Sequence, residues 1–128
     1  MTTELTYLTL VTLLNALLWI PYILNLIMVR GLLDAVGYPS DPKPLAAWAA
    51  RMKAGHYNAV ENLVIFAVLV LIVQSAGLNN ETTAMACMIY FWARVAHIVS
   101  YTFAIPWVRT LACAAGFFCQ LALVLQIL

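Results

Sequence analysis

The sequence predicts an all-α integral membrane protein, an antiparallel four-helix bundle, and three observations indicate this fold class. Hydrophobic residues make up 66% of the 128 residues and charged residues only 9%, whereas a soluble domain has about 25% charged residues. Four apolar stretches are long enough to span a membrane, which takes about 20 helical residues. None of them alternates apolar and polar residues at period two, as the strands of a membrane barrel do. The composition therefore excludes a soluble globular domain.

We expect a single domain of residues 1–128 with spans near 5–29, 59–76, 82–105 and 108–128. The first span has no Lys or Arg before its apolar run, so we interpret it as a retained span rather than a secretory signal. Pro21 predicts a kink in it. Asn15, Tyr22 and Asn25 project to roughly one side of the same span, which favours hydrogen bonds to other helices.

The connections between these spans are short, so consecutive helices should be antiparallel neighbours. The first connection, Gly31 to Pro44, contains three prolines and should be ordered in turns rather than helical. Residues 45–53 can begin the second helix before it enters the membrane. The other two connections are the polar turn at residues 77–81 and a very tight turn at residues 105–107.

Basic residues lie in or beside the first and third connections and are absent from the N-terminus and the second connection. They are Arg30, Lys43, Arg51, Lys53 and Arg109. The positive-inside rule then places both termini outside the cytoplasm. For a bacterial source, helical spans imply the inner membrane. The net charge of +1 without a basic run argues against nucleic-acid binding.

The three cysteines, Cys87, Cys113 and Cys119, stand in apolar runs without metal-type spacing. We therefore interpret them as buried free thiols, and we expect no metal site. A haem held by His56 and His97 is not expected either, because the predicted helix faces of the two histidines diverge.

The second span carries a polar face. At about 100° per residue, Asn58 and Asn62 lie within roughly 20° of Arg51, and Glu61 lies about 80° to one side. His56 points about 140° away from Arg51. We therefore expect His56 at a subunit contact or in the headgroup region.

The third span carries a polar stripe about 60° wide, formed by Tyr90, Arg94, His97 and Tyr101. A buried Arg94 needs a partner, and a Glu61–Arg94 ion pair between the second and third helices is the simplest one. Such a pair could equally fix the register of the two helices or serve the function. His97, taken alone, is typical of a hydrogen-bonded histidine at a helix interface, and Arg109 of an interfacial anchor.

Several of these residues fall near one membrane depth at the same end of the bundle: Arg51, Asn58, Glu61, Tyr101 and Arg109. So many hydrogen-bond donors in one place suit an anionic small molecule with several acceptor groups. A small transporter is less well supported, because the first span has no ionisable residue in mid-membrane.

The same residues form one combined pattern, which comprises Arg51, His56, Asn58, Glu61 and Asn62 on the second span, Arg94, His97 and Tyr101 on the third, and Arg109 after it. With four spans and a chain of 128 residues, this pattern resembles the MAPEG family, the membrane-associated proteins of eicosanoid and glutathione metabolism. The resemblance covers essentially the whole chain. Within the family, the chain is similar to a bacterial-type relative of microsomal glutathione transferase.

The resemblance implies a homotrimer that binds glutathione in a cleft between subunits, open to the cytoplasm. Asn58, Glu61 and Tyr101 would hold the tripeptide, and Arg109 would be the catalytic residue that acts on its thiol. A nearby guanidinium favours the thiolate, which is the nucleophile. Arg30 would reach the site from the neighbouring subunit. Arg51, Arg94 and His97, on the same polar faces, complete the expected glutathione-binding set.

The implied function is a glutathione-dependent transferase or peroxidase that acts on a lipophilic electrophile or lipid hydroperoxide taken from the bilayer. The alternative is a non-catalytic glutathione- or lipid-binding membrane scaffold of the same fold. Ala54 favours the alternative, because the better-characterised enzymes carry an arginine at that position. Asn62 also replaces a frequent tyrosine, and both changes fit a bacterial-type branch.

Overall fold

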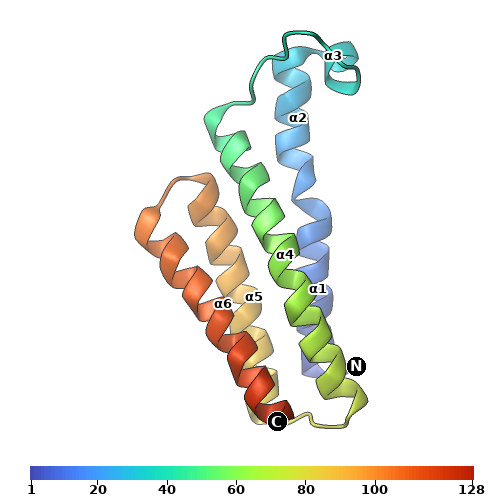
Figure 1. Cartoon of the computed structure of the whole chain (residues 1–128), viewed down its shortest axis with the longest axis vertical. Helices are drawn as coiled ribbons and strands as arrows, with labels where there is room; N and C mark the ends of the chain where they lie inside the picture. The colour runs from blue at the N-terminus through green and yellow to red at the C-terminus, as the bar shows by residue number, and fades with distance from the viewer.

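The computed structural model describes residues 1–128 and is built of helices alone (Figure 1). The helices are α1 (Thr3–Leu17), α2 (Trp19–Arg30), α3 (Leu32–Val36), α4 (Ala47–Ser75), α5 (Glu81–Thr102) and α6 (Pro106–Ile127). Four spans are long and apolar enough to cross a membrane, with α1 and α2 together forming the first. The predicted all-α fold with four membrane-spanning helices is therefore confirmed.

The first span is interrupted where its proline predicts a kink. Helix α1 ends at Leu17 and α2 begins at Trp19. Pro21 has no N–H for the Leu17 carbonyl, and its ring crowds that oxygen, so the helix breaks one turn before the proline. Of the three polar residues on this span, Asn15 bonds within its own helix, to the Val11 carbonyl. Within this chain, Asn15 therefore forms no hydrogen bond to another helix.

The first connection differs from the prediction, because it contains the short helix α3. Gly31 turns the chain at a φ of 77°, and the three prolines come only after α3 has ended, so nothing prevents one helical turn at Leu32–Val36. Asn25 Oδ1 then accepts a hydrogen bond from Ala46 N, just before α4 begins. At 29 residues, α4 is about 44 Å long and exceeds the roughly 30 Å core of a bilayer, as its early start predicts.

The other two connections are tight turns. Asn80 caps α5 through a capping box with Thr83, which satisfies two otherwise unpaired backbone donors. The α5–α6 turn passes through Ala104, which has a φ of 57°, and Pro106 then stands at the start of α6, where its missing N–H costs nothing. Figure 1 shows this turn and the α2–α4 connection at one end of the bundle and both termini at the other.

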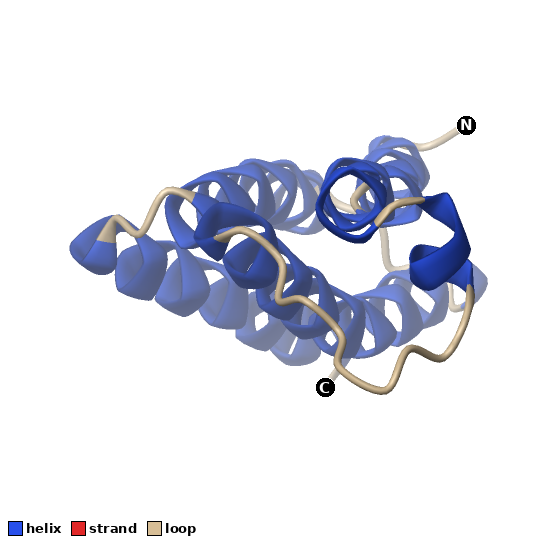
Figure 2. Cartoon of the chain, turned by 90° about the horizontal axis from the view of Figure 1, so that it is seen from above, coloured by secondary structure: helices blue, strands red, loops and turns tan.

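The apolar core lies where α1, α4, α5 and α6 meet. Phe66 of α4 stacks on Tyr90 of α5 with ring centroids 3.8 Å apart, and buried aliphatic residues such as Val11 and Leu123 surround them. Many large apolar side chains are exposed on the outside, as a lipid-facing surface requires. Seen from above, the α2–α4 connection crosses one end of the bundle (Figure 2). We call this the basic end, because it carries Arg30, Lys43, Arg51, Lys53 and Arg109.

Candidate functional site

A cavity of about 580 Å³ lies between α4, α5 and α6 near the basic end, and we call it the polar cavity. Its lining residues are Asn58, His97, Tyr101, Arg109, Thr110, Cys113, Ala114 and Phe117. Four of them, Asn58, His97, Tyr101 and Arg109, are among the eight predicted site residues. The helices α4, α5 and α6 thus bring the predicted polar groups together.

Tyr101 stands at the centre of this arrangement. The guanidinium carbon of Arg109 lies 4.9 Å from the Tyr101 ring centroid, and the His97 ring meets the same tyrosine edge-on at 5.6 Å. The short α5–α6 turn folds Arg109 back over α5 and so permits this contact. The cation over the ring is worth about 0.5–1 kcal/mol at an exposed site, which favours this orientation of the Arg109 side chain.

Gly55 of α4 lets Tyr101 approach. A Cβ at Gly55 would lie 2.8 Å from Ile98 Cδ1 and 3.3 Å from Tyr101 Cγ. A larger residue would displace the end of the Ile98 side chain and press on the Tyr101 ring, so this glycine permits the close approach of α4 and α5 beside the cavity.

Arg94 is the most buried cation of the chain, with 2% of its surface exposed. Its Nη2 donates a 2.9 Å hydrogen bond to Asn58 Oδ1, and its Nε has no partner. The predicted Glu61–Arg94 ion pair is therefore wrong within the chain. Glu61 stands three residues after Asn58, about 60° further round the helix, and its side chain is exposed.

The Asn58 backbone continues the polar contacts towards α6. Its carbonyl accepts from Asn62 Nδ2 at 3.0 Å, and the Asn62 carbonyl accepts from Gln120 Nε2 at 3.3 Å. The sequence placed Asn62 on the same face as Asn58. Gln120 was missed, although a buried glutamine in an otherwise apolar helix is a detectable signal.

Arg51 lines a smaller adjoining cavity of about 210 Å³, which it shares with Tyr101 and Arg109. Its Nε donates to the Thr102 carbonyl at 2.9 Å. This carbonyl belongs to the last residue of α5, where a cation satisfies an unpaired acceptor and the negative end of the helix dipole. Arg51 thus closes one wall of the site while holding the end of α5.

A family model described as the MAPEG family matches residues 8–128. The chain belongs to the MAPEG family. The family includes glutathione transferases and peroxidases as well as non-catalytic members. The family and the four apolar helices make the chain an integral membrane protein. A search of curated proteins gives no match for this sequence.

Four of the eight predicted site residues of this MAPEG chain do not line the polar cavity. Arg51 lines the adjoining cavity and Arg94 is buried. Arg30 donates from Nε to the Lys43 carbonyl at 2.7 Å and so ties the α2–α4 connection to α2. Glu61 faces outward. His56, expected at a subunit contact or in the headgroup region, instead faces α2, where its Nδ1 lies 2.7 Å from the Tyr22 hydroxyl. That contact is an interhelical hydrogen bond of the kind expected for Tyr22.

The MAPEG chain also uses residues of α6 that the sequence reasoning missed. Cys113 and Phe117 follow Arg109 at intervals of four residues and share its helix face, so this spacing was the available signal. Cys113 is exposed, which corrects the expectation that all three cysteines are buried. Cys87 and Cys119 are buried as expected.

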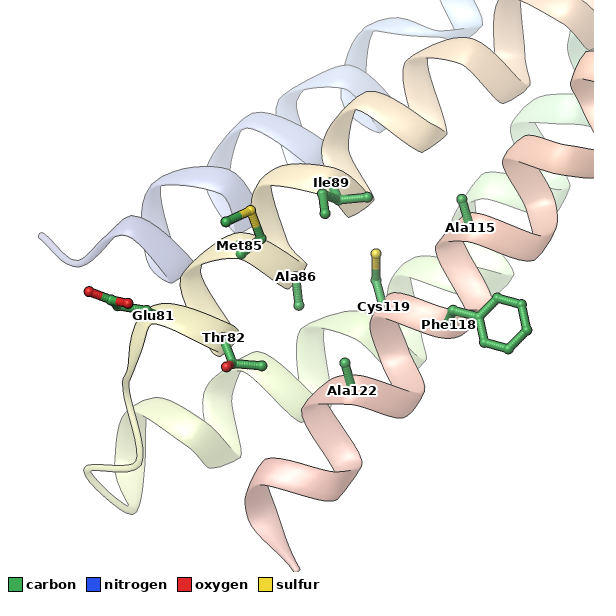
Figure 3. Close-up of a pocket in the computed structure, with 9 residues that line it drawn as sticks. All are labelled: Glu81, Thr82, Met85, Ala86, Ile89, Ala115, Phe118, Cys119 and Ala122. Carbon is green, nitrogen blue, oxygen red and sulfur yellow. The ribbon is translucent and has the colours of Figure 1, made fainter.

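A second cavity of about 580 Å³ lies between α5 and α6, towards the end away from the polar cavity (Figure 3). Apolar side chains such as Met85, Ile89 and Phe118 line it, and Glu81 at its margin points away from them (Figure 3). No group of charged side chains converges there. Its chemistry suits hydrocarbon, so the candidate site for a polar ligand is the polar cavity.

Proposed function

We propose that this chain binds glutathione in the polar cavity and directs its thiol at a lipophilic electrophile or a lipid hydroperoxide. The observation that carries the proposal is the convergence of Asn58, His97, Tyr101 and Arg109 on one cavity, next to a buried guanidinium without a bonded counter-ion. An anionic tripeptide with many hydrogen-bonding groups matches this set of donors.

Each residue of the cavity has a role that follows from its position. Arg109 is exposed at the cavity, where its charge favours the thiolate form of the bound thiol. Asn58, His97 and Tyr101 offer hydrogen bonds to the peptide. Arg94 does not line the cavity itself, but it holds Asn58 through Nη2 and adds positive charge beside it. Arg51 stands at the adjoining cavity and extends the cationic wall.

Glu61 and Arg30 would act across a subunit boundary in a homotrimer. Glu61 lies on the outer face of α4, about 21 Å from the start of that helix, next to the exposed Val60 and Val64. A carboxylate facing lipid at this depth costs several kcal/mol. A neighbouring copy that brings a cation to Glu61 would remove this cost, which supports assembly through the α4 face.

The basic end would face the cytoplasm, with both termini on the other side of the membrane, because basic residues gather there. For a bacterial source the membrane would be the inner one. Glutathione would reach the polar cavity from the aqueous cytoplasm, while the second substrate would diffuse in laterally from the bilayer. Holding both at one site reduces the entropic cost of their encounter.

The alternative is a non-catalytic glutathione- or lipid-binding scaffold. Ala54 favours it, because this exposed position of α4 lacks the arginine that the resemblance implies. A binding protein needs the cavity but does not need activation of the thiol.

Isothermal titration of the detergent-purified protein with glutathione tests the proposal, together with thiolate absorbance and turnover of an aryl halide. Arg109→Ala should reduce thiolate absorbance more than affinity, and Glu61→Ala should weaken binding and assembly together. Binding with a glutathione-dependent rate would support the enzyme, and binding without turnover would support the scaffold. Absence of binding to the wild type would overturn the proposal.

A further inference from the structure

An exposed thiol of the protein itself lies in the polar cavity. Cys87 and Cys119 are buried, whereas Cys113 is exposed and lines the cavity with Arg109 and Asn58. Cys113 follows Arg109 by one helical turn on the same face of α6. The cavity therefore holds a sulfur nucleophile next to a guanidinium.

Independent features of the same cavity indicate that it is built for a polar ligand. His97 lines it with only 3% of its surface exposed, and its Nδ1 is buried without a hydrogen-bond partner. Arg94, three residues earlier on α5 and not among the residues that line the cavity, leaves its Nε unpaired as well. Buried polar atoms without partners are rare and cost about 1–3 kcal/mol each. A polar occupant that reached His97 Nδ1 would remove this cost there.

We propose that Cys113 is a reversible glutathionylation site, an inference that rests on the proposed glutathione site. The thiolate sulfur of Cys113 attacks one sulfur of glutathione disulfide and forms a mixed disulfide with it. The original sulfur–sulfur bond breaks, and the second glutathione leaves as a thiolate that takes up the proton released by Cys113. Cysteine is oxidised and one glutathione is reduced, so the exchange needs no other oxidant.

The mixed disulfide blocks the site. The attached tripeptide fills a cavity of about 580 Å³, which lies within the usual range of about 300–1,000 Å³ for a ligand site, and leaves no room for a free glutathione. A second exchange with free glutathione restores the thiol. The ratio of glutathione disulfide to glutathione thus controls occupancy of the site.

Intact mass spectrometry of the purified full chain after incubation with glutathione disulfide tests the modification. We expect one glutathionyl group on the wild type, removed by dithiothreitol and absent from Cys113→Ser. The buried Cys87 and Cys119 serve as controls within the chain. No adduct on the wild type, or an equal adduct on Cys113→Ser, would overturn the proposal.

A comparison of two reagents tests whether the cavity selects the tripeptide. Arg109→Gln should slow modification by the anionic glutathione disulfide several-fold more than modification by the neutral hydroxyethyl disulfide, because the lost charge attracts only the anion. Using the ratio of the two rates cancels any effect on the thiol itself. An unchanged ratio would overturn recognition by the cavity.

Titration of Cys113→Ser with glutathione separates this proposal from the proposed function. If Cys113→Ser binds glutathione as tightly as the wild type does, and the wild type forms no glutathionyl adduct, the Cys113 proposal alone is overturned. Loss of glutathione binding in both proteins overturns the proposed function. The glutathionylated wild type should no longer bind glutathione, and retained binding would contradict the blocking role.

Discussion

The two ends of the bundle both bury polar side chains, but they differ in whether the buried polar atoms have hydrogen-bond partners. At the end that holds the termini, the buried Thr83 donates to the buried Glu4 at 2.6 Å. Around this pair, Thr2 bonds to the half-buried Gln74 and the exposed Asn80 bonds to Gln126. Along α5 towards the basic end, four buried polar atoms have no partner: Tyr90 OH, Arg94 Nε, His97 Nδ1 and Thr102 Oγ1. A completed network holds helices together. Of the four residues with unpaired atoms, His97 lines the polar cavity, and its unpaired Nδ1 indicates a ligand there.

Asn58→Leu should have the largest effect, because Asn58 is the side chain that accepts from the buried Arg94. A hydrogen bond to a charged group is worth about 1.5–3 kcal/mol, so we expect the free energy of unfolding to fall by about that amount and glutathione binding to be lost. Chemical denaturation in detergent and titration measure the two effects. Asn79→Leu, at an exposed position in the α4–α5 turn, is the control. Unchanged stability would contradict the assigned contact.

Thr83→Val should destabilise the end that holds the termini without affecting ligand binding. It removes the donor to Glu4 and half of the α5 capping box, at a cost of about 1–3 kcal/mol. The adjacent Thr82 is exposed, and Thr82→Val should change stability by less than about 0.5 kcal/mol. Reduced glutathione affinity in Thr83→Val at temperatures where it stays folded would contradict the separation of the two ends.

Arg94→Met should reverse that pattern. Arg94 has no bonded counter-ion, so an apolar side chain of similar length removes the cost of burying a lone charge. Loss of the positive charge beside Asn58 should weaken glutathione binding at least tenfold, about 1.4 kcal/mol. Thermal unfolding and titration of the same sample check both statements. Strong destabilisation with unchanged affinity would mean that Arg94 stabilises the fold and has no role in glutathione binding.

The fold was predictable because its causes are local. Apolar length and composition determine the spans, Pro21 determines the break after Leu17, and Pro106 marks the start of α6. Helical spacing also predicted that Asn58, His97 and Tyr101 lie near one another, and all three line the polar cavity. Helical spacing could not assign partners, because a helical wheel of one segment carries no information about how two helices are rotated relative to each other. The relative rotation of α4 and α5 brings Arg94 to Asn58 rather than to Glu61.

Tyr101 should give the smallest effect on stability and the finest test of the polar cavity. Its ring supports Arg109 at 4.9 Å and its hydroxyl is available to a ligand. Tyr101→Phe keeps the ring, so we expect unchanged stability and a several-fold loss of glutathione affinity.

Tyr101→Leu also removes the cation–π contact, worth about 0.5–1 kcal/mol, and frees Arg109 to move. Thiolate absorbance of bound glutathione should therefore fall in Tyr101→Leu and persist in Tyr101→Phe. Equal absorbance in both variants would show that Arg109 needs no support from the ring. The α5–α6 turn alone would then hold Arg109 at the polar cavity.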